Sequence, residues 1–144
     1  MDAWTLEKIK QHIDDGLPFM ALFNIDVVEA SAERARVRLG AGTNVKRPGG
    51  SIAGPVQFAL ADVATYALIL ATRHDAAAAT VDLTINFLRP ALEFPLICEA
   101  LPLRAGRRLF TADARIVEQT TGRLVTQATA TYALTGEPKP PAAR

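Results

Sequence analysis

The chain has 144 residues, of which 49% are hydrophobic and 22% charged, a composition typical of one globular domain with a sizeable core. Its formal net charge of +1 gives no general electrostatic attraction to nucleic acid or to an anionic membrane, so we expect neither as a partner. The single cysteine, Cys98, excludes an internal disulfide and a cysteine-based zinc cluster, and two histidines are too few for a polyhistidine metal site.

The first part of the chain is predicted to form a short helix, two strands and a long loop. Trp4–Ile13 has the apolar spacing of an amphipathic helix. Strands are expected at Phe23–Ala30 and at Glu33–Leu39, the second of which alternates apolar residues with arginines. Gly40–Ile52 is rich in glycine, asparagine and proline and is expected to be a loop.

A long apolar helix follows, and it starts at Gly54-Pro55 because proline suits the first helical turn, where its missing N–H would be unpaired anyway. From Val56 to Thr72 the segment is apolar on all sides, which indicates a helix buried in a protein core or a membrane. Its one charged residue, Asp62, is costly in either place unless it is paired or used chemically. Because Asp62 and Gln57 lie within the segment and amphipathic strands surround it, we expect a core helix.

Four more strands are predicted by alternation of apolar and polar residues, at Thr80–Leu88, Phe94–Arg104, Leu109–Glu118 and Arg123–Leu134. The order of elements indicates an α+β fold, with a six-stranded antiparallel sheet wrapped around the apolar helix and a short N-terminal helix. We expect one domain over residues 1–136, a disordered tail over residues 137–144, and a second copy of the chain against the exposed sheet edge. The N-terminus lacks the pattern of a secretory signal, so we expect a soluble, cytoplasmic protein.

Three features together resemble a known family. They are the glycine-rich segment before the helix (Gly49 to Pro55), Asp62 eight residues after Gly54, and the strand Thr80 to Pro90. This pattern is similar to hotdog-fold acyl-CoA thioesterases, and most similar to the phenylacetic-acid-pathway (PaaI-type) group, over roughly Phe19 to Leu134. The resemblance implies a homodimer that assembles further into a homotetramer, with two active sites at each dimer interface and no cofactor.

The resemblance also implies roles for four residues. Asp62 activates water or attacks the thioester itself, and the N–H of Gly54 polarises the thioester carbonyl. Asn44 orients substrate or water, and Thr80 forms a hydrogen bond with the carboxylate. Asn44 and Gly54 of one subunit face Asp62 and Thr80 of the other. The histidine usual in the family before this glycine is Ala53 here, which removes a residue that helps to polarise the carbonyl.

Helix geometry independently favours a site shared between two subunits. Thioester hydrolysis needs an activated water or nucleophile and a donor for the developing oxyanion, and a helix N-terminus supplies such donors. Gly54 and Asp62 are eight residues apart, so they are separated by about 12 Å along the axis of one helix. One helix therefore does not bring both groups to the same carbonyl, whereas a second helix does.

Basic residues are expected at the mouth of the pocket, because coenzyme A carries phosphates. The candidates are Arg89, Arg107 and Arg108, and the alternative for each is an ordinary solvated charge at a turn. Pro55 and Phe58, in the first turns of the helix, are candidates for the acyl slot, as is Tyr66, with packing as the alternative.

Two other functions remain open. One is a hotdog enoyl-CoA hydratase or dehydratase, whose histidine and acid must lie within hydrogen-bond reach, a role that His12 and His74 do not fit. The other is a non-catalytic acyl-CoA-binding protein, which the missing histidine at Ala53 supports and which Asp62 with Thr80 opposes. For a thioesterase, the acyl group is expected to be aromatic or of short to medium length. Asp62 also has a structural alternative, as a buried residue that caps a loop or pairs with an arginine.

Overall fold

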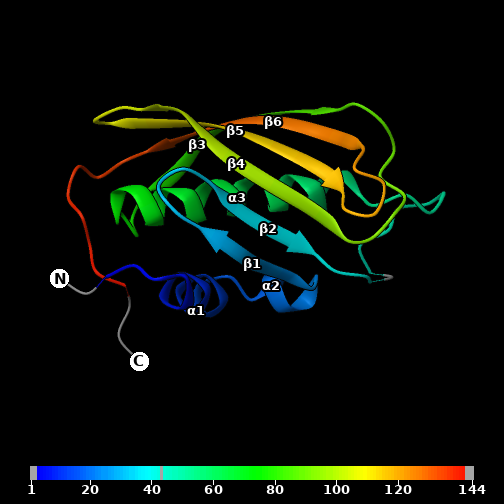
Figure 1. Ribbon diagram of the computed structural model, residues 1–144, viewed down its shortest axis with the longest axis horizontal. Helices are drawn as coiled ribbons and strands as arrows, with labels where there is room; N and C mark the ends of the chain where they lie inside the picture. Colours follow the sequence, from blue (N-terminus) through cyan, green and yellow to red (C-terminus); the bar gives the residue numbers. More distant parts are fainter. Residues whose placement is uncertain (1–2, 43, 142–144) are drawn as a thin grey trace.

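The computed structural model describes residues 3–42 and 44–141. Its elements are, in chain order, α1 Leu6–Gly16, α2 Phe19–Leu22, β1 Ile25–Ala30, β2 Ala35–Leu39, α3 Gly54–Arg73, β3 Ala79–Phe87, β4 Leu96–Ala105, β5 Leu109–Glu118 and β6 Leu124–Ala133. The strands form one antiparallel sheet in the order β1-β2-β4-β5-β6-β3, and this sheet curves around α3 (Figure 1). The predicted α+β hotdog fold is therefore confirmed, while the one-turn helix α2 was not predicted.

Both ends of α3 follow from local backbone chemistry. Ala53 is extended (φ −64°, ψ 141°), as the residue before a helix start usually is, and Pro55 lies in the first turn. At the other end His74 adopts the left-handed conformation (φ 57°) and its backbone N–H donates to the carbonyl of Leu70. This geometry is that of an αL cap, and it ends the helix at Arg73.

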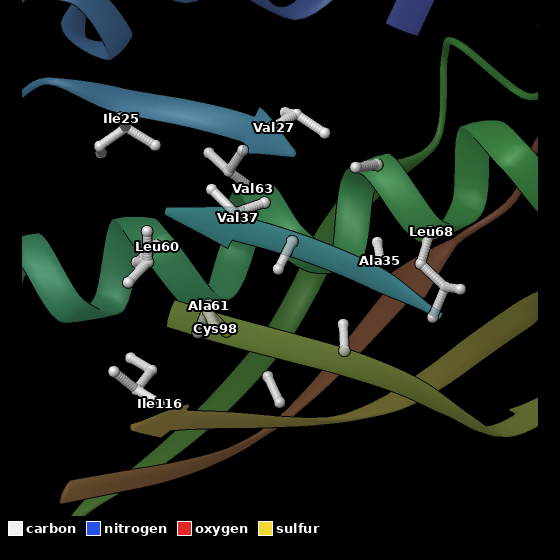
Figure 2. Close-up of a cluster of buried hydrophobic side chains, with 14 of the residues drawn as sticks. Ile25, Val27, Ala35, Val37, Leu60, Ala61, Val63, Leu68, Cys98 and Ile116 are labelled. Carbon is white, nitrogen blue, oxygen red and sulfur yellow. The ribbon is translucent and has the colours of Figure 1, made fainter. Parts of the chain in front are cut away.

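The core lies between α3 and the concave face of the sheet. Figure 2 shows side chains of α3 packed among those of the strands, including Leu60, Val63, Val37, Cys98 and Ile116. Cys98 is completely buried, as expected for a small core residue. α3 is long and apolar enough to cross a membrane. The rest of the fold, however, buries 61% of its most apolar 18-residue stretch, so α3 is the core helix of the domain.

The two ends of the described chain lie together beside α1 (Figure 1). The predicted tail, residues 137–144, is described as far as Pro141. The Lys139 N–H donates to the carbonyl of His74 at 2.6 Å, and the Lys139 carbonyl accepts a hydrogen bond from the Trp4 indole at 2.8 Å. These contacts hold the segment against the end of α3 and the start of α1.

β3 is an edge strand, paired with β6 on one side only. None of its residues is fully buried, and Val81 and Phe87 are 57% and 52% exposed. A long edge strand with exposed apolar side chains is a surface that readily pairs with another strand.

Glu118, the last residue of β5, is a fully buried carboxylate with four donors. Oε2 accepts from the N–H groups of Leu92 (2.8 Å) and Glu93 (3.0 Å), and Oε1 accepts from Thr121 Oγ1 (2.8 Å) and Arg123 Nε (3.2 Å). Burial alone would raise the pKa of Glu118, but these hydrogen bonds outweigh it and lower the pKa from 4.5 to about 2. The carboxylate thus ties the β3–β4 loop to the β5–β6 turn.

We expect Glu118→Gln to lower the free energy of unfolding at pH 7 by about 2 kcal/mol, the scale of hydrogen bonds to a charged group. A glutamate whose folded pKa is depressed stabilises the fold above its unfolded pKa of 4.5, and this contribution is lost as the pH falls towards 2. The difference between variant and wild type should therefore shrink between pH 6 and pH 3, measured by denaturant unfolding. The control is Glu93→Gln, because that side chain is exposed. A difference that stays constant with pH would contradict the assignment.

Candidate active site

The carboxylate of Asp62, in the middle of α3, lies at a cavity of about 270 Å³. The cavity is bounded by α1, α3 and the paired ends of β3 and β6, and its lining is a mixture of apolar and polar side chains, including Ile13, Leu17, Phe19, Val63, His12, Tyr66, Thr80 and Tyr132. Because Thr80 is exposed, the cavity reaches the surface at the start of the edge strand β3.

Two hydroxyl groups donate to one oxygen of this carboxylate. Thr80 Oγ1 and Tyr132 Oη each lie 2.8 Å from Asp62 Oδ1. The Tyr132 hydroxyl is also 3.0 Å from the backbone carbonyl oxygen of Asp62. No ion pair of Asp62 exists in the described part of the chain, so the alternative in which an arginine neutralises it does not apply there.

A β-bulge turns Thr80 towards Asp62. Thr80 pairs with Tyr132 and Asp82 pairs with Thr131, so Val81 is the extra residue on β3. Simple alternation would place Thr80 on the outer face with Asp82, but the bulge shifts the pattern by one residue. Thr80 therefore shares the inner face with the buried Tyr132. Val81 is exposed, although simple alternation predicts that it faces the core.

His12 and Tyr66 form a second polar pair in the same cavity. The Tyr66 hydroxyl donates to the carbonyl of Ala76 at 2.7 Å, so His12 Nε2–H is the donor in the 2.9 Å contact between His12 and the Tyr66 oxygen. Burial lowers the pKa of His12, and the negative charge of Asp15 opposes this shift. Burial, and then the charge of Asp75, raise the pKa of Tyr66 to about 12.

Gly54 lies at a second cavity, of about 500 Å³, with Gln57, Phe87 and Arg89 in its wall. Within residues 3–42 and 44–141 the Gly54 N–H has no hydrogen-bond acceptor, as is usual in the first turn of a helix. A Cβ at this position would lie 3.0 Å from the ring of Phe87, so glycine lets this ring pack closely against the start of α3. Gln57 supports this helix start, since its Nε2 donates to the Ile52 carbonyl.

Of the other predicted residues, Asn44 and Arg89 lie apart from Asp62, whereas Phe58 precedes Asp62 by four residues on α3 and lies on the same side of that helix. Asn44 donates to the carbonyl of Leu22 at 2.8 Å, in the loop beside the start of α3. Arg89 lines the Gly54 cavity and donates to the carbonyl of Leu124. Pro55 and Phe58 are exposed and line neither of these two cavities.

Arg107 and Arg108 are exposed at the β4–β5 turn, beside a surface hollow of about 580 Å³. Because Leu109 and Ala79 both pair with Ala133, this turn lies at the end of the sheet where β3 starts. It is therefore at the same end as Thr80 and at the opposite end from Phe87. Within a single chain, Asp62 and Thr80 thus lie at one cavity. Gly54 and Arg89 lie at another.

Sequence reasoning missed Tyr132 and His12, and left Tyr66 undecided between packing and lining the slot. Tyr66 follows Asp62 by four residues and so lies on the same face of the helix, a signal that was available. His12 was not expected to lie beside a catalytic acid. It shares the cavity with Asp62, and its hydrogen bond goes to Tyr66. Among the described residues, no group of three or more His, Cys, Asp or Glu side chains is placed to hold a metal ion.

Comparison with solved structures supports the same fold. A conserved protein from Pseudomonas aeruginosa is 25% identical, with a TM-score of 0.75, over 81% of this chain and 92% of that one. A thioesterase from Haemophilus influenzae is 18% identical, with a TM-score of 0.80, over 92% and 91% of the two chains. Zebrafish thioesterase superfamily member 2 is 22% identical, with a TM-score of 0.80, over 92% and 99%.

No functionally curated protein matches the sequence. The family model described as the thioesterase superfamily matches residues 49–125, which are more than half of the chain and include Gly54, Asp62 and Thr80. The chain therefore belongs to the thioesterase superfamily.

Proposed function

We propose that this protein is an acyl-CoA thioesterase in which Asp62 is the general base or the nucleophile. The observation that carries the proposal is the Asp62 carboxylate itself, which is held by two hydroxyl donors at an open cavity and is not neutralised by a cation among the described residues. A carboxylate at the wall of a cavity lined by both apolar and polar side chains is typical of a catalytic group.

The dimer proposed for this enzyme forms through β3. Antiparallel pairing of two copies of β3 about a two-fold axis places the start of each strand opposite the end of the other. Thr80 lies at the start of β3 and contacts Asp62, while Phe87 lies at the end and contacts Gly54. The pairing thus brings Asp62 towards Gly54 of the partner subunit, and two such dimers would form the homotetramer.

The reaction follows from this arrangement. Asp62 takes a proton from a water molecule whose oxygen attacks the thioester carbonyl carbon, and the carbonyl electron pair moves to the oxygen. The N–H of Gly54 of the partner subunit, at the positive end of α3, stabilises that oxyanion. When the carbonyl re-forms, the C–S bond breaks, and the thiolate takes the proton from Asp62 to give the free acid and coenzyme A. If Asp62 attacks directly, the same donor stabilises the tetrahedral intermediate, the C–S bond breaks, and the coenzyme A thiolate leaves an acyl anhydride on Asp62. Water then cleaves this anhydride to give the free acid and restore the Asp62 carboxylate, and a proton of that water passes to the thiolate.

The phosphates of coenzyme A are proposed to bind Arg107 and Arg108 of one subunit, with Arg89 of the partner subunit. Arg107 and Arg108 lie at the end of the sheet that carries Thr80, and Arg89 follows Phe87 at the other end. In the antiparallel dimer these two ends face each other, so cations from both chains flank one entrance. Exposed arginines beside a pocket mouth are well suited to phosphate groups.

We expect the double variant Arg107→Ala/Arg108→Ala to raise KM for an acyl-CoA by about tenfold while kcat changes little, because it removes charged contacts made equally in ground and transition states. The same acyl group on pantetheine, which lacks the nucleotide phosphates, should show no such rise. Arg115→Ala is the control variant, since Arg115 is exposed on β5 and pairs with Asp113. Equal changes in KM for both substrates would show that the two arginines do not bind the phosphates of coenzyme A.

A hydrolysis screen tests the proposed function. Purified protein is incubated with aromatic, short-chain and medium-chain acyl-CoAs, and free thiol release is measured, together with loss of the conjugated double bond of an enoyl-CoA. Thiol release with at least one ester supports the thioesterase. Loss of the double bond without thiol release would support the hydratase, a possibility kept open by His12 in the Asp62 cavity. Saturable binding without either reaction would support a non-catalytic protein.

A further inference from the structure

We infer that Tyr132 is a positioning residue for Asp62, which fixes the carboxylate so that Oδ2 is the oxygen that reacts. This inference rests on the proposed thioesterase function. Tyr132 lies in β6, outside the segment matched by the family model, and its hydroxyl contacts Asp62 at the wall of the same cavity.

The two hydroxyl donors divide the carboxylate into a held and a free oxygen. Both Thr80 Oγ1 and Tyr132 Oη lie 2.8 Å from Oδ1. Within the part of the chain that the structure describes, Oδ2 accepts no hydrogen bond. A base or nucleophile needs an oxygen with an available lone pair in a fixed direction, and this arrangement provides one.

Tyr132 restricts the Asp62 side chain more than Thr80 does. Its hydroxyl oxygen lies 2.8 Å from Oδ1 and 3.0 Å from the Asp62 backbone carbonyl oxygen. It therefore contacts both the side chain and the backbone of Asp62. The Tyr132 side chain is only 3% exposed, and its ring stacks on that of Tyr66 with a centroid distance of 6.1 Å. Thr80, in contrast, is exposed on the edge strand.

The chemistry of the phenol suits a permanent donor. Burial first, and then the negative charge of Asp62, raise the pKa of Tyr132 well above the usual value for tyrosine. The hydroxyl therefore keeps its proton over the whole pH range in which an enzyme works. A hydrogen bond from a neutral donor to a carboxylate is also stronger than one between neutral groups.

We expect Tyr132→Phe to lower kcat by about 10- to 100-fold, the effect of one hydrogen bond to a charged group, with a much smaller change in KM. The acid limb of the pH–rate profile should move to higher pH, because a carboxylate that loses a donor is protonated more easily. A residue that only packs the core would not move this limb. Tyr66→Phe is the matched control, since it removes a phenol hydroxyl from the same cavity without touching Asp62, and it should leave the acid limb in place.

A measurement independent of activity keeps the inference testable if Tyr132→Phe folds poorly. The chain has two tyrosines, so 3-fluorotyrosine incorporated into the Tyr66→Phe variant reports on Tyr132 alone. Its fluorine resonance should shift with pH in step with the acid limb, and Asp62→Asn should abolish that shift.

The outcomes separate this inference from the proposed function. If Asp62→Asn is inactive while Tyr132→Phe keeps the wild-type kcat and acid limb, the positioning role is overturned and the thioesterase stands. A fluorine chemical shift that does not change over the pH range of the acid limb also overturns the positioning role. If Asp62→Asn hydrolyses acyl-CoA at the wild-type rate, the proposed function is overturned, and the inference with it.

Discussion

Replacing Asp62 with asparagine is expected to lower kcat for acyl-CoA hydrolysis by about 1,000-fold, within the range that positioned general bases contribute. Asparagine has almost the same shape, and its carbonyl oxygen can still accept the hydrogen bonds of Thr80 and Tyr132. The change therefore falls on the other oxygen, which an amide nitrogen replaces. That nitrogen is neither a base nor a nucleophile, so binding should survive while turnover is lost.

The matched control for this variant is Asp82→Asn. Asp82 lies on the same strand as Thr80, two residues further on, but it is exposed and faces outwards beyond the bulge. Its replacement should leave kcat and KM unchanged. Equal unfolding midpoints for both variants would show that the loss in Asp62→Asn is chemical. Wild-type turnover by Asp62→Asn would remove Asp62 from the mechanism.

The fold was largely predictable because its signals are local. Alternation located five of the six strands, and the bounds of Leu109–Glu118 agree with β5 at both ends. The all-round apolar character of residues 56–72 indicated a buried helix, and α3 is that helix. The four-residue helix α2 was missed because one turn carries no periodicity.

The candidate site was only partly predictable, because much of it depends on pairing between distant strands. Asp62 was noticeable as a lone charge in an apolar helix, and its contact with Thr80 followed from the family resemblance. Tyr132 reaches the same carboxylate because β6 lies against α3, and Thr80 joins it through the register of β3 with β6, which shifts at the bulge. No local pattern reveals such a register. The place of His12 similarly depends on how α1 packs across the fold.

Two inactive variants are expected to restore activity when they are combined, because each proposed site takes Gly54 from one subunit and Asp62 from the other. Gly54→Pro removes the N–H donor, and loss of one oxyanion donor lowers kcat by about 10²–10³-fold. Proline is acceptable in the first helical turn, and Ala53 already has the extended backbone required of a residue before proline. Phe87, which a new ring would approach, is 52% exposed within one subunit.

Equal amounts of Gly54→Pro and Asp62→Asn chains, refolded together, should regain about a quarter of the wild-type activity, since that share of randomly assembled sites has both groups intact. Mixing Asp62→Asn with Thr80→Ala is the control, because both changes lie in the same half of the site and no pairing of those chains rebuilds it. Tetramer formation does not alter the expected fraction, which depends only on the two chains at each site. Recovery in the first mixture alone would show that the edge strand β3 assembles the catalytic centre, since the 12 Å or so along one helix keeps Gly54 and Asp62 from acting together within a chain. Absence of recovery, with both proteins shown to exchange subunits, would place the whole reaction within one subunit and require another oxyanion donor near Asp62.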